Sequence, residues 1–289
     1  MNQHEPVLLK EVIDFLHIKR ALKYIDATLG TGGHSLEIVK RGGRVLGIDA
    51  DESMLEIARK RLEGKDDFKL VHGNFKDIAK IAEANGFGKV NGILFDLGVS
   101  NVHFKTRGRG FSFTDESSPL DMRLDPENQK VTAADLVNAL REDQLEEMFG
   151  QAMPRHEAAK LAGKVVESRV ETRIETVADF LRASSFLRRK GKLNPATKAF
   201  LAMRIAVNLE LKNLEEALPG AFGLLASGGS LLVISFHSLE DRLVKNFFKE
   251  KKASGEARIK TKKPLVPSEE EVKINPKSRS ARLRVLIKI

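Results

Sequence analysis

Short apolar runs alternate with longer charged, periodic segments over residues 22–96, which predicts βαβ units and a parallel sheet. The runs that predict strands are Leu22–Asp26, Arg44–Asp49, Phe68–His72 and Val90–Asp96. The segments that predict helices are Ser35–Arg41, Glu52–Leu62 and Asp77–Asn85. Three of these strands end at an aspartate, and ligands of open α/β sheets bind at the carboxyl edge where such residues gather.

The alternation stops after Ser100. Residues 101–125 are rich in Gly, Ser, Arg and Asp, and a stretch of this length predicts a functional or mobile loop. The pattern from 132 to 218 is almost entirely helical and begins with a capping run at Thr132–Asp135. We therefore expect a helical insertion at 126–193 within a core formed by 1–125 and 194–289.

The strand pattern returns near the end of the chain. A glycine pair opens an apolar strand at Gly228–Ser235, and a helix is expected over Leu239–Lys252. An N-cap is expected at Ser238. Apolar residues alternate with Arg284 and Lys288 over the last seven positions, which predicts a half-buried final strand.

Composition limits the chemistry. The chain has 289 residues and no cysteine, which excludes disulfides, thiolate metal sites and a cysteine nucleophile. No i, i+4 pair occurs among the seven histidines, so we expect no metal. The first residues lack the pattern of a signal peptide and no apolar run could span a bilayer, so we expect a cytoplasmic protein without a membrane partner.

Charge favours an anionic partner. The formal net charge is +9. Residues 245–263 hold eight basic and two acidic side chains, and residues 273–288 hold six basic and none acidic. A third basic run, at 188–192, consists of Arg188, Arg189, Lys190 and Lys192. Any one run could be a solvated surface, but three of them in a basic protein favour RNA.

A glycine-rich turn predicts a cofactor site. Gly30, Gly32 and Gly33 lie between a strand and a helix, where free amides favour an anionic group. An isolated glycine cluster is more often a plain turn, but Asp49 ends the next strand, where a carboxylate can accept from ribose hydroxyls. The spacing is a poor match to a dinucleotide fingerprint and fits S-adenosylmethionine better. Phe75 either covers an adenine ring or belongs to the core.

Asp96 is the candidate catalytic residue. It ends the fourth strand and is followed by a flexible Leu-Gly-Val-Ser run. A carboxylate there could hold the hydrogens of an exocyclic amine and align its lone pair with a sulfonium methyl group. A lone aspartate at a strand end more often caps a turn. Methylation at pyrimidine carbon 5 normally needs a cysteine, so amine or hydroxyl methylation remains.

Seven sequence blocks resemble, in the same order, those of the bacterial small-subunit ribosomal RNA cytosine-N(4) methyltransferase family (RsmH/MraW type). They are Asp26–Ser35, Asp96–Ser100, Arg109–Phe113, Pro119–Arg123, Pro195–Phe200, Ile234–Arg242 and Asn275–Ser280. The resemblance implies a Rossmann-like class I methyltransferase core interrupted by an all-helical domain. It also implies S-adenosylmethionine as donor and a cytidine in the decoding region of small-subunit (16S) rRNA, free or in the 30S particle, as acceptor.

By position, the resemblance implies donor contacts, with Asp96 beside the reacting centre. These contacts are Gly32, Gly33, His34, Asp49, Phe75 and Asp96. Two departures affect this implication. His103 stands where the family has a glutamine contact, and it can donate and accept, but with pH dependence. The block Phe149–Ala152 replaces a Tyr-Gly-Glu-Glu sequence and so removes two carboxylates.

Two other functions stay open at this point. One is methylation of an amine in DNA or in another RNA. The other is an RNA-binding assembly factor with a degenerate donor site, which the altered Phe149–Ala152 block suggests. A Ser-His-Asp hydrolase built on Ser235, His237 and Asp241 lacks the nucleophile elbow and is discounted. Whether the chain forms a homodimer is also open.

Overall fold

The computed structural model describes residues 6–106, 108–187 and 194–289, and it divides into two compact units. The first unit contains residues up to Gly98 together with Leu211–Ile289, and the second contains Val99–Glu210. The basic run at 188–192 lies outside the described residues.

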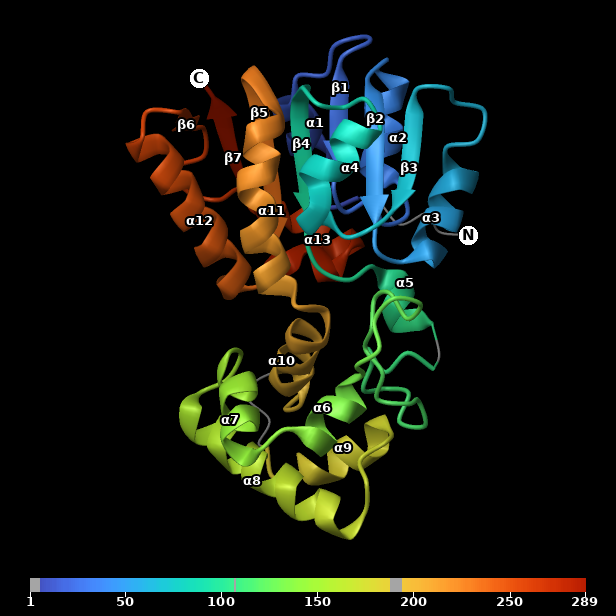
Figure 1. The fold of residues 1–289 in the computed structure, drawn as a ribbon, viewed down its shortest axis with the longest axis vertical. Coiled ribbons are helices and arrows are strands. Elements are labelled where there is room, and N and C mark those ends of the chain that lie inside the picture. Colours follow the sequence, from blue (N-terminus) through green and yellow to red (C-terminus); the bar gives the residue numbers. More distant parts are fainter. Residues whose placement is uncertain (1–5, 107, 188–193) are drawn as a thin grey trace. The chain divides into compact units, whose positions relative to one another are not determined.

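A seven-stranded sheet in the order β3-β2-β1-β4-β5-β7-β6 forms the centre of the first unit (Figure 1). Its strands are β1 (Lys23–Asp26), β2 (Arg44–Asp49), β3 (Phe68–His72), β4 (Val90–Asp96), β5 (Leu225–Ser235), β6 (Ala257–Ile259) and β7 (Arg282–Lys288). The first five strands are parallel, whereas β7 runs antiparallel to both β5 and β6. The parallel units that the apolar pattern predicts are therefore confirmed.

Helices cover both faces of this sheet because its buried strands carry apolar side chains on both sides. They are α1 (Leu9–Leu16), α2 (Gly33–Lys40), α3 (Glu52–Arg61), α4 (Ile78–Ala84), α11 (Glu210–Leu224), α12 (Ser238–Ala253) and α13 (Glu269–Ile274), with short 3-10 turns η1 (Phe75–Asp77) and η2 (Pro276–Ser280). Ile25 packs in a cluster with α4, α11 and α12, while its neighbour Tyr24 packs in another with α1 and α2. Because successive side chains of β1 pack against helices on opposite faces of the sheet, the position of the strand end is fixed.

Two expectations for the C-terminal region are wrong. The final strand is not half-buried, because β7 lies inside the sheet and Arg284 is covered together with its apolar neighbours. The Arg284 guanidinium is tolerated there because it makes two hydrogen bonds to Asp241, at 2.7 and 3.0 Å. The N-cap of α12 is His237 rather than Ser238, in a capping box with Glu240.

The second unit is helical and has its own hydrophobic core. Its helices are α5 (Asn101–Lys105), α6 (Ala133–Ala139), α7 (Glu142–Gly150), α8 (Arg155–Glu171), α9 (Val177–Ala183) and α10 (Thr197–Asn208). Its bounds differ from the expected 126–193 because Phe111 and Leu120 on one side, and Phe200 and Met203 on the other, are buried in this core. Among the described residues, no helix is both long and apolar enough to cross a membrane.

Candidate active site

Four polar residues end neighbouring strands of the first unit. Asp49, Asp26, Asp96 and Ser235 close β2, β1, β4 and β5 respectively, and these strands are adjacent in the sheet. The register pairs Asp96 with Ile234, one residue before Ser235. Parallel pairing thus brings together three carboxylates that are far apart in sequence, as the strand-end pattern predicts.

The turn after β1 has the backbone conformation that its glycines allow. Gly30 and Gly32 have φ values of +52° and +76°, in the left-handed region. A Cβ on Gly33 would lie 2.4 Å from the Pro6 side chain, so a larger residue would displace that segment. The main chain of this turn therefore lies at the carboxyl edge of the sheet, without side chains at its glycines.

Asp49 fixes this turn. Its Oδ2 accepts a hydrogen bond from the Gly30 amide at 2.7 Å, and its Oδ1 accepts from the Asp51 amide at 2.9 Å. Each carboxylate oxygen has two acceptor positions, so these bonds orient Asp49 and leave it able to accept from ligand hydroxyls. The ribose contact expected of Asp49 stays a prediction.

Asp26 is almost completely buried, and the sequence reasoning did not assign it a role in the site. Its Oδ2 accepts from the Ser35 hydroxyl at 2.7 Å, while its Oδ1 has no hydrogen-bond partner among the described residues. Burial raises the pKa of Asp26 to about 6, an effect partly offset by the Ser35 bond. A buried carboxylate oxygen that lacks a hydrogen-bond partner suits a ligand that brings a hydrogen-bond donor or a positive charge.

Asp96 shows the same feature more strongly. Its amide donates to the Thr28 hydroxyl at 2.6 Å, which fixes the strand end, while its Oδ1 is buried and has no hydrogen-bond partner in the described chain. Burial, followed by the negative charges of Asp26, Glu240 and Glu271, raises the pKa of Asp96 well above its ordinary value. Such a carboxylate is a candidate proton acceptor.

His34 supplies the nearest ring nitrogen to this carboxylate. Its Nδ1 lies 3.7 Å from Asp96 Oδ2, and its Nε2 lies 3.0 Å from the Val7 carbonyl oxygen. A carbonyl can only accept, so Nε2 carries a hydrogen, and Nδ1 is the ring nitrogen on the side of Asp96. The histidine that follows the glycine turn in sequence thus lies beside the aspartate that ends β4.

Phe75 has a structural role whatever else it does. It begins the 3-10 turn after β3, and its ring meets that of Phe95 edge to face at a centroid distance of 5.7 Å. It is half-buried and packs against the main core of the first unit. This position is compatible with both predictions for Phe75, as a cover for an adenine ring and as a core residue.

The loop after β5 is built around Glu240. This buried carboxylate accepts from the Phe236 amide at 2.8 Å and lies 3.1 Å from His237 Nε2. A Cβ on Gly98 would lie 3.4 Å from the Phe236 ring, so the turns after β4 and β5 are close neighbours. Glu240 adds to the negative charge that raises the pKa of Asp96, and sequence reasoning missed this effect.

His103, the remaining predicted contact, belongs to the second unit. It is buried, and its ring centroid lies 5.4 Å from that of Phe111. The Arg109 guanidinium lies over the Phe111 ring, 5.5 Å from its centroid. The contact of His103 with a donor stays a prediction.

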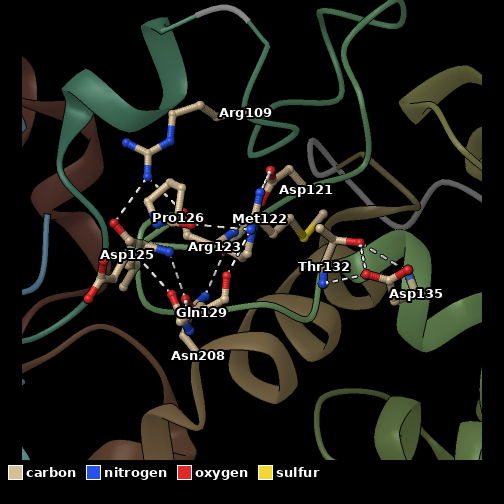
Figure 2. A network of polar contacts seen from close by, with 11 residues as sticks. Arg109, Asp121, Met122, Arg123, Asp125, Pro126, Gln129, Thr132, Asp135 and Asn208 are labelled. Atoms are coloured by element: carbon tan, nitrogen blue, oxygen red, sulfur yellow. Dashed lines mark hydrogen bonds and ion pairs between the residues drawn. The ribbon is translucent and has the colours of Figure 1, made fainter.

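Arg109 also joins two of the family-like blocks (Figure 2). Its guanidinium donates to the carbonyl oxygens of Arg123 and Leu124 at 2.7 and 3.2 Å. Met122 adopts a left-handed backbone with φ +62°, and its amide and carbonyl are bonded to the Arg109 carbonyl and the Asn208 side chain. The block Pro119–Arg123 therefore pins the long loop, one of the roles that its sequence allows.

The Phe149–Ala152 departure falls partly in the core. Phe149 is fully buried, with its ring centroid 6.1 Å from that of Phe180, so this position needs no hydroxyl group. Gln151 is exposed, so an amide at this position in place of the carboxylate of the family block does not affect the fold.

Comparisons with known proteins agree with these features. The sequence profile of the MraW methylase family matches residues 1–289. A protein of Sulfurihydrogenibium sp. named "Ribosomal RNA small subunit methyltransferase H" is 46% identical over 99% of both chains. A protein of the same name from Persephonella marina is 43% identical over 100% of both chains. Another, from Carboxydothermus hydrogenoformans, is 44% identical over 99% of this chain and 98% of its own.

Proposed function

The chain belongs to the MraW methylase family, and from that premise we propose that it methylates a cytidine of small-subunit (16S) rRNA at the exocyclic N(4) amine. The methyl donor is S-adenosylmethionine, and the acceptor lies in the decoding region. The observation that carries the proposal is the buried Oδ1 of Asp96, which has no hydrogen-bond partner among the described residues. It lies at a sheet edge that also holds the glycine turn and Asp49.

The residues of this edge fit the donor chemically. S-adenosylmethionine supplies an electrophilic methyl carbon on a positively charged sulfur. Two buried carboxylates with unbonded oxygens, those of Asp26 and Asp96, favour a cationic ligand. Gly32, Gly33 and His34 would hold its amino-acid end, Asp49 its ribose and Phe75 its adenine, with His103 as a further contact.

Asp96 performs the chemical role in this proposal. The lone pair of a cytosine amine is delocalised into the ring, which makes the amine a poor nucleophile. The Asp96 carboxylate accepts a hydrogen bond from this amine, localises the lone pair and fixes its direction. Its raised pKa then suits it to take the proton that the amine loses on methylation.

We propose that the second unit, Val99–Glu210, recognises the rRNA and that the expected insertion, residues 126–193, contributes to this role. A target base has to leave its stack to reach Asp96, as enzymes that modify bases require. For such a substrate we propose that the protein acts in the cytoplasm, on free rRNA or on the 30S particle.

Methyl transfer from labelled S-adenosylmethionine to purified small subunits, free small-subunit rRNA and duplex DNA tests this function. We expect label in an rRNA species, and nucleoside mass mapping should find N(4)-methylcytidine. Label in DNA alone, or at another atom, would overturn the proposal. Binding of rRNA without binding of the donor by calorimetry would instead identify an assembly factor.

A further inference from the structure

The positive charge of the chain is concentrated at its C-terminal end. Residues 236–289 carry 15 basic and seven acidic side chains, whereas residues 1–235 carry 34 basic and 33 acidic ones. Almost all of the +9 net charge therefore comes from the part of the first unit that follows β5.

Two rows of cations in this region lie on adjacent elements. On α12, Lys245, Lys249 and Lys252 are spaced by four and three residues, which places them along one stripe of the helix, beside the stripe that carries the buried Val244 and Phe248. The second row consists of Arg258, which lies in β6, and of Lys260 and Lys262, which follow the end of that strand where the chain bends. Helix α12 and β6 lie side by side at the edge of the sheet (Figure 1).

These cations are available to an anionic partner. Lys249 and Lys252, like the three cations of the second row, are exposed. No member of either row forms an ion pair with a carboxylate in the described parts of the chain. By contrast, Lys251 is paired with Glu256 in the same segment, and Lys40 and Arg41 are paired with Glu37 on α2.

The second row runs toward the candidate active site. The sheet register aligns Asp96 with Ile234, Ile234 with Leu283, and Leu283 with Leu265, so Leu265 is level with Asp96 across three strand spacings, or about 14 Å. Arg258 pairs with Ile287, four positions from Leu283 along β7. The chain from Arg258 to Leu265 thus leads from the far end of the sheet to the edge that holds Asp96.

We propose that the two rows, on α12 and along Arg258–Lys262, bind the phosphate backbone of the RNA that enters the active site. This inference rests on the proposed function and adds a binding surface on the first unit, outside the helical insertion. Cations at separate positions along these two elements can each contact a separate phosphate. Contacts of this kind position RNA without reading its sequence.

Filter binding of free small-subunit rRNA at several salt concentrations tests the surface. The variant carries Arg258→Ala, Lys260→Ala and Lys262→Ala, and its matched control carries Lys60→Ala, Lys65→Ala and Lys80→Ala, three exposed lysines elsewhere on the first unit. The loss of three phosphate contacts should weaken binding about tenfold or more at low salt and make the slope of log affinity against log salt shallower by about two. The control should keep both values, and melting curves should show all three proteins folded.

Parallel assays separate the possible failures. We expect the variant to bind S-adenosylmethionine normally and to keep kcat at saturating rRNA, with a raised KM for rRNA. If the variant keeps the rRNA affinity and salt slope of the unchanged protein, the surface does not bind RNA. Aggregation of the variant would then indicate that the cations instead protect the edge strand β6 against pairing with strands of other molecules. If the unchanged protein transfers no methyl group but the variant still loses rRNA affinity, the proposed function fails and the surface stands.

Discussion

His34 Nδ1 lies 3.7 Å from Asp96 Oδ2, although the two residues are 62 positions apart in sequence. The parallel pairing of β1 with β4 makes them neighbours, because α2 begins after the turn that follows β1. The His34 ring therefore lies next to a carboxylate whose pKa is raised by burial. In the proposed function, Asp96 accepts the hydrogen bond of the amine, and His34 is the ring beside it.

Asp96→Asn should lower kcat by about 10²–10³-fold, because the amide oxygen still accepts a hydrogen bond but no longer carries a charge that stabilises the transition state. The measurement is single-turnover methylation of rRNA at saturating donor. Affinity for rRNA should not change. The control is Asp67→Asn, at an exposed carboxylate before β3. Wild-type turnover in Asp96→Asn would remove Asp96 from its proposed role.

His34→Phe should reduce kcat about 10²-fold by removing the nitrogen beside Asp96, at the lower end of typical proton-transfer contributions. It should also cost about 1–3 kcal/mol of folding free energy, because the Val7 carbonyl loses its partner at Nε2. Urea unfolding gives the second quantity. His34→Gln, which can still donate to Val7, should regain stability but not kcat. If His34→Gln has full activity, the Nδ1 position has no part in proton transfer.

Much of the first unit follows from local patterns. The predicted strands Arg44–Asp49, Phe68–His72 and Val90–Asp96 coincide with β2, β3 and β4, because buried parallel strands have continuous apolar runs. The strand-end aspartates and the glycine turn were also found, since the positions where strands end are visible in the sequence.

Other features depend on contacts between distant residues. Burial of Arg284 in β7 is possible only because Asp241, 43 positions earlier, meets it. The expected insertion began too late and ended too early, because no local signal shows that Phe111 and Phe200 belong to the helical core. The roles of Asp26 and Glu240 in raising the pKa of Asp96 depend in the same way on three-dimensional proximity.

Asp26→Asn should change how stability depends on pH. Burial raises the pKa of Asp26 from 3.8 to about 6, so the folded protein holds this proton more tightly than the unfolded chain does. The resulting stabilisation is fully present below about pH 4 and is lost as the pH rises through about 6. It amounts to about 3 kcal/mol, from the size of the pKa shift.

Asparagine at position 26 stays neutral and can still accept from Ser35. Urea unfolding should therefore show Asp26→Asn to be more stable than the unchanged protein at pH 7.5, with little difference at pH 4. Donor affinity should fall at neutral pH, because the variant lacks a negative charge for a cationic ligand. A pH profile of stability that matches the unchanged protein would contradict the assignment.

Asn208→Ala should destabilise the second unit by about 2–4 kcal/mol, because it removes several buried hydrogen bonds at once. The Asn208 amide group donates to the Met122 carbonyl and accepts from the Leu124 amide, both at 2.9 Å (Figure 2). These bonds hold Met122 in a left-handed conformation that costs about 1–2 kcal/mol by itself. Without them, the loop between Arg109 and Leu124 should open more often.

Hydrogen exchange at the Leu124 amide measures this opening directly, and urea unfolding measures the stability. Asn128→Ala is the control, because Asn128 lies in the same segment but is exposed and bonds only to Asp125 among the described residues. We expect fast exchange in Asn208→Ala and unchanged exchange in Asn128→Ala. If the two substitutions change hydrogen exchange and the free energy of unfolding equally, the buried side chain of Met122, rather than Asn208, holds the left-handed turn at Met122.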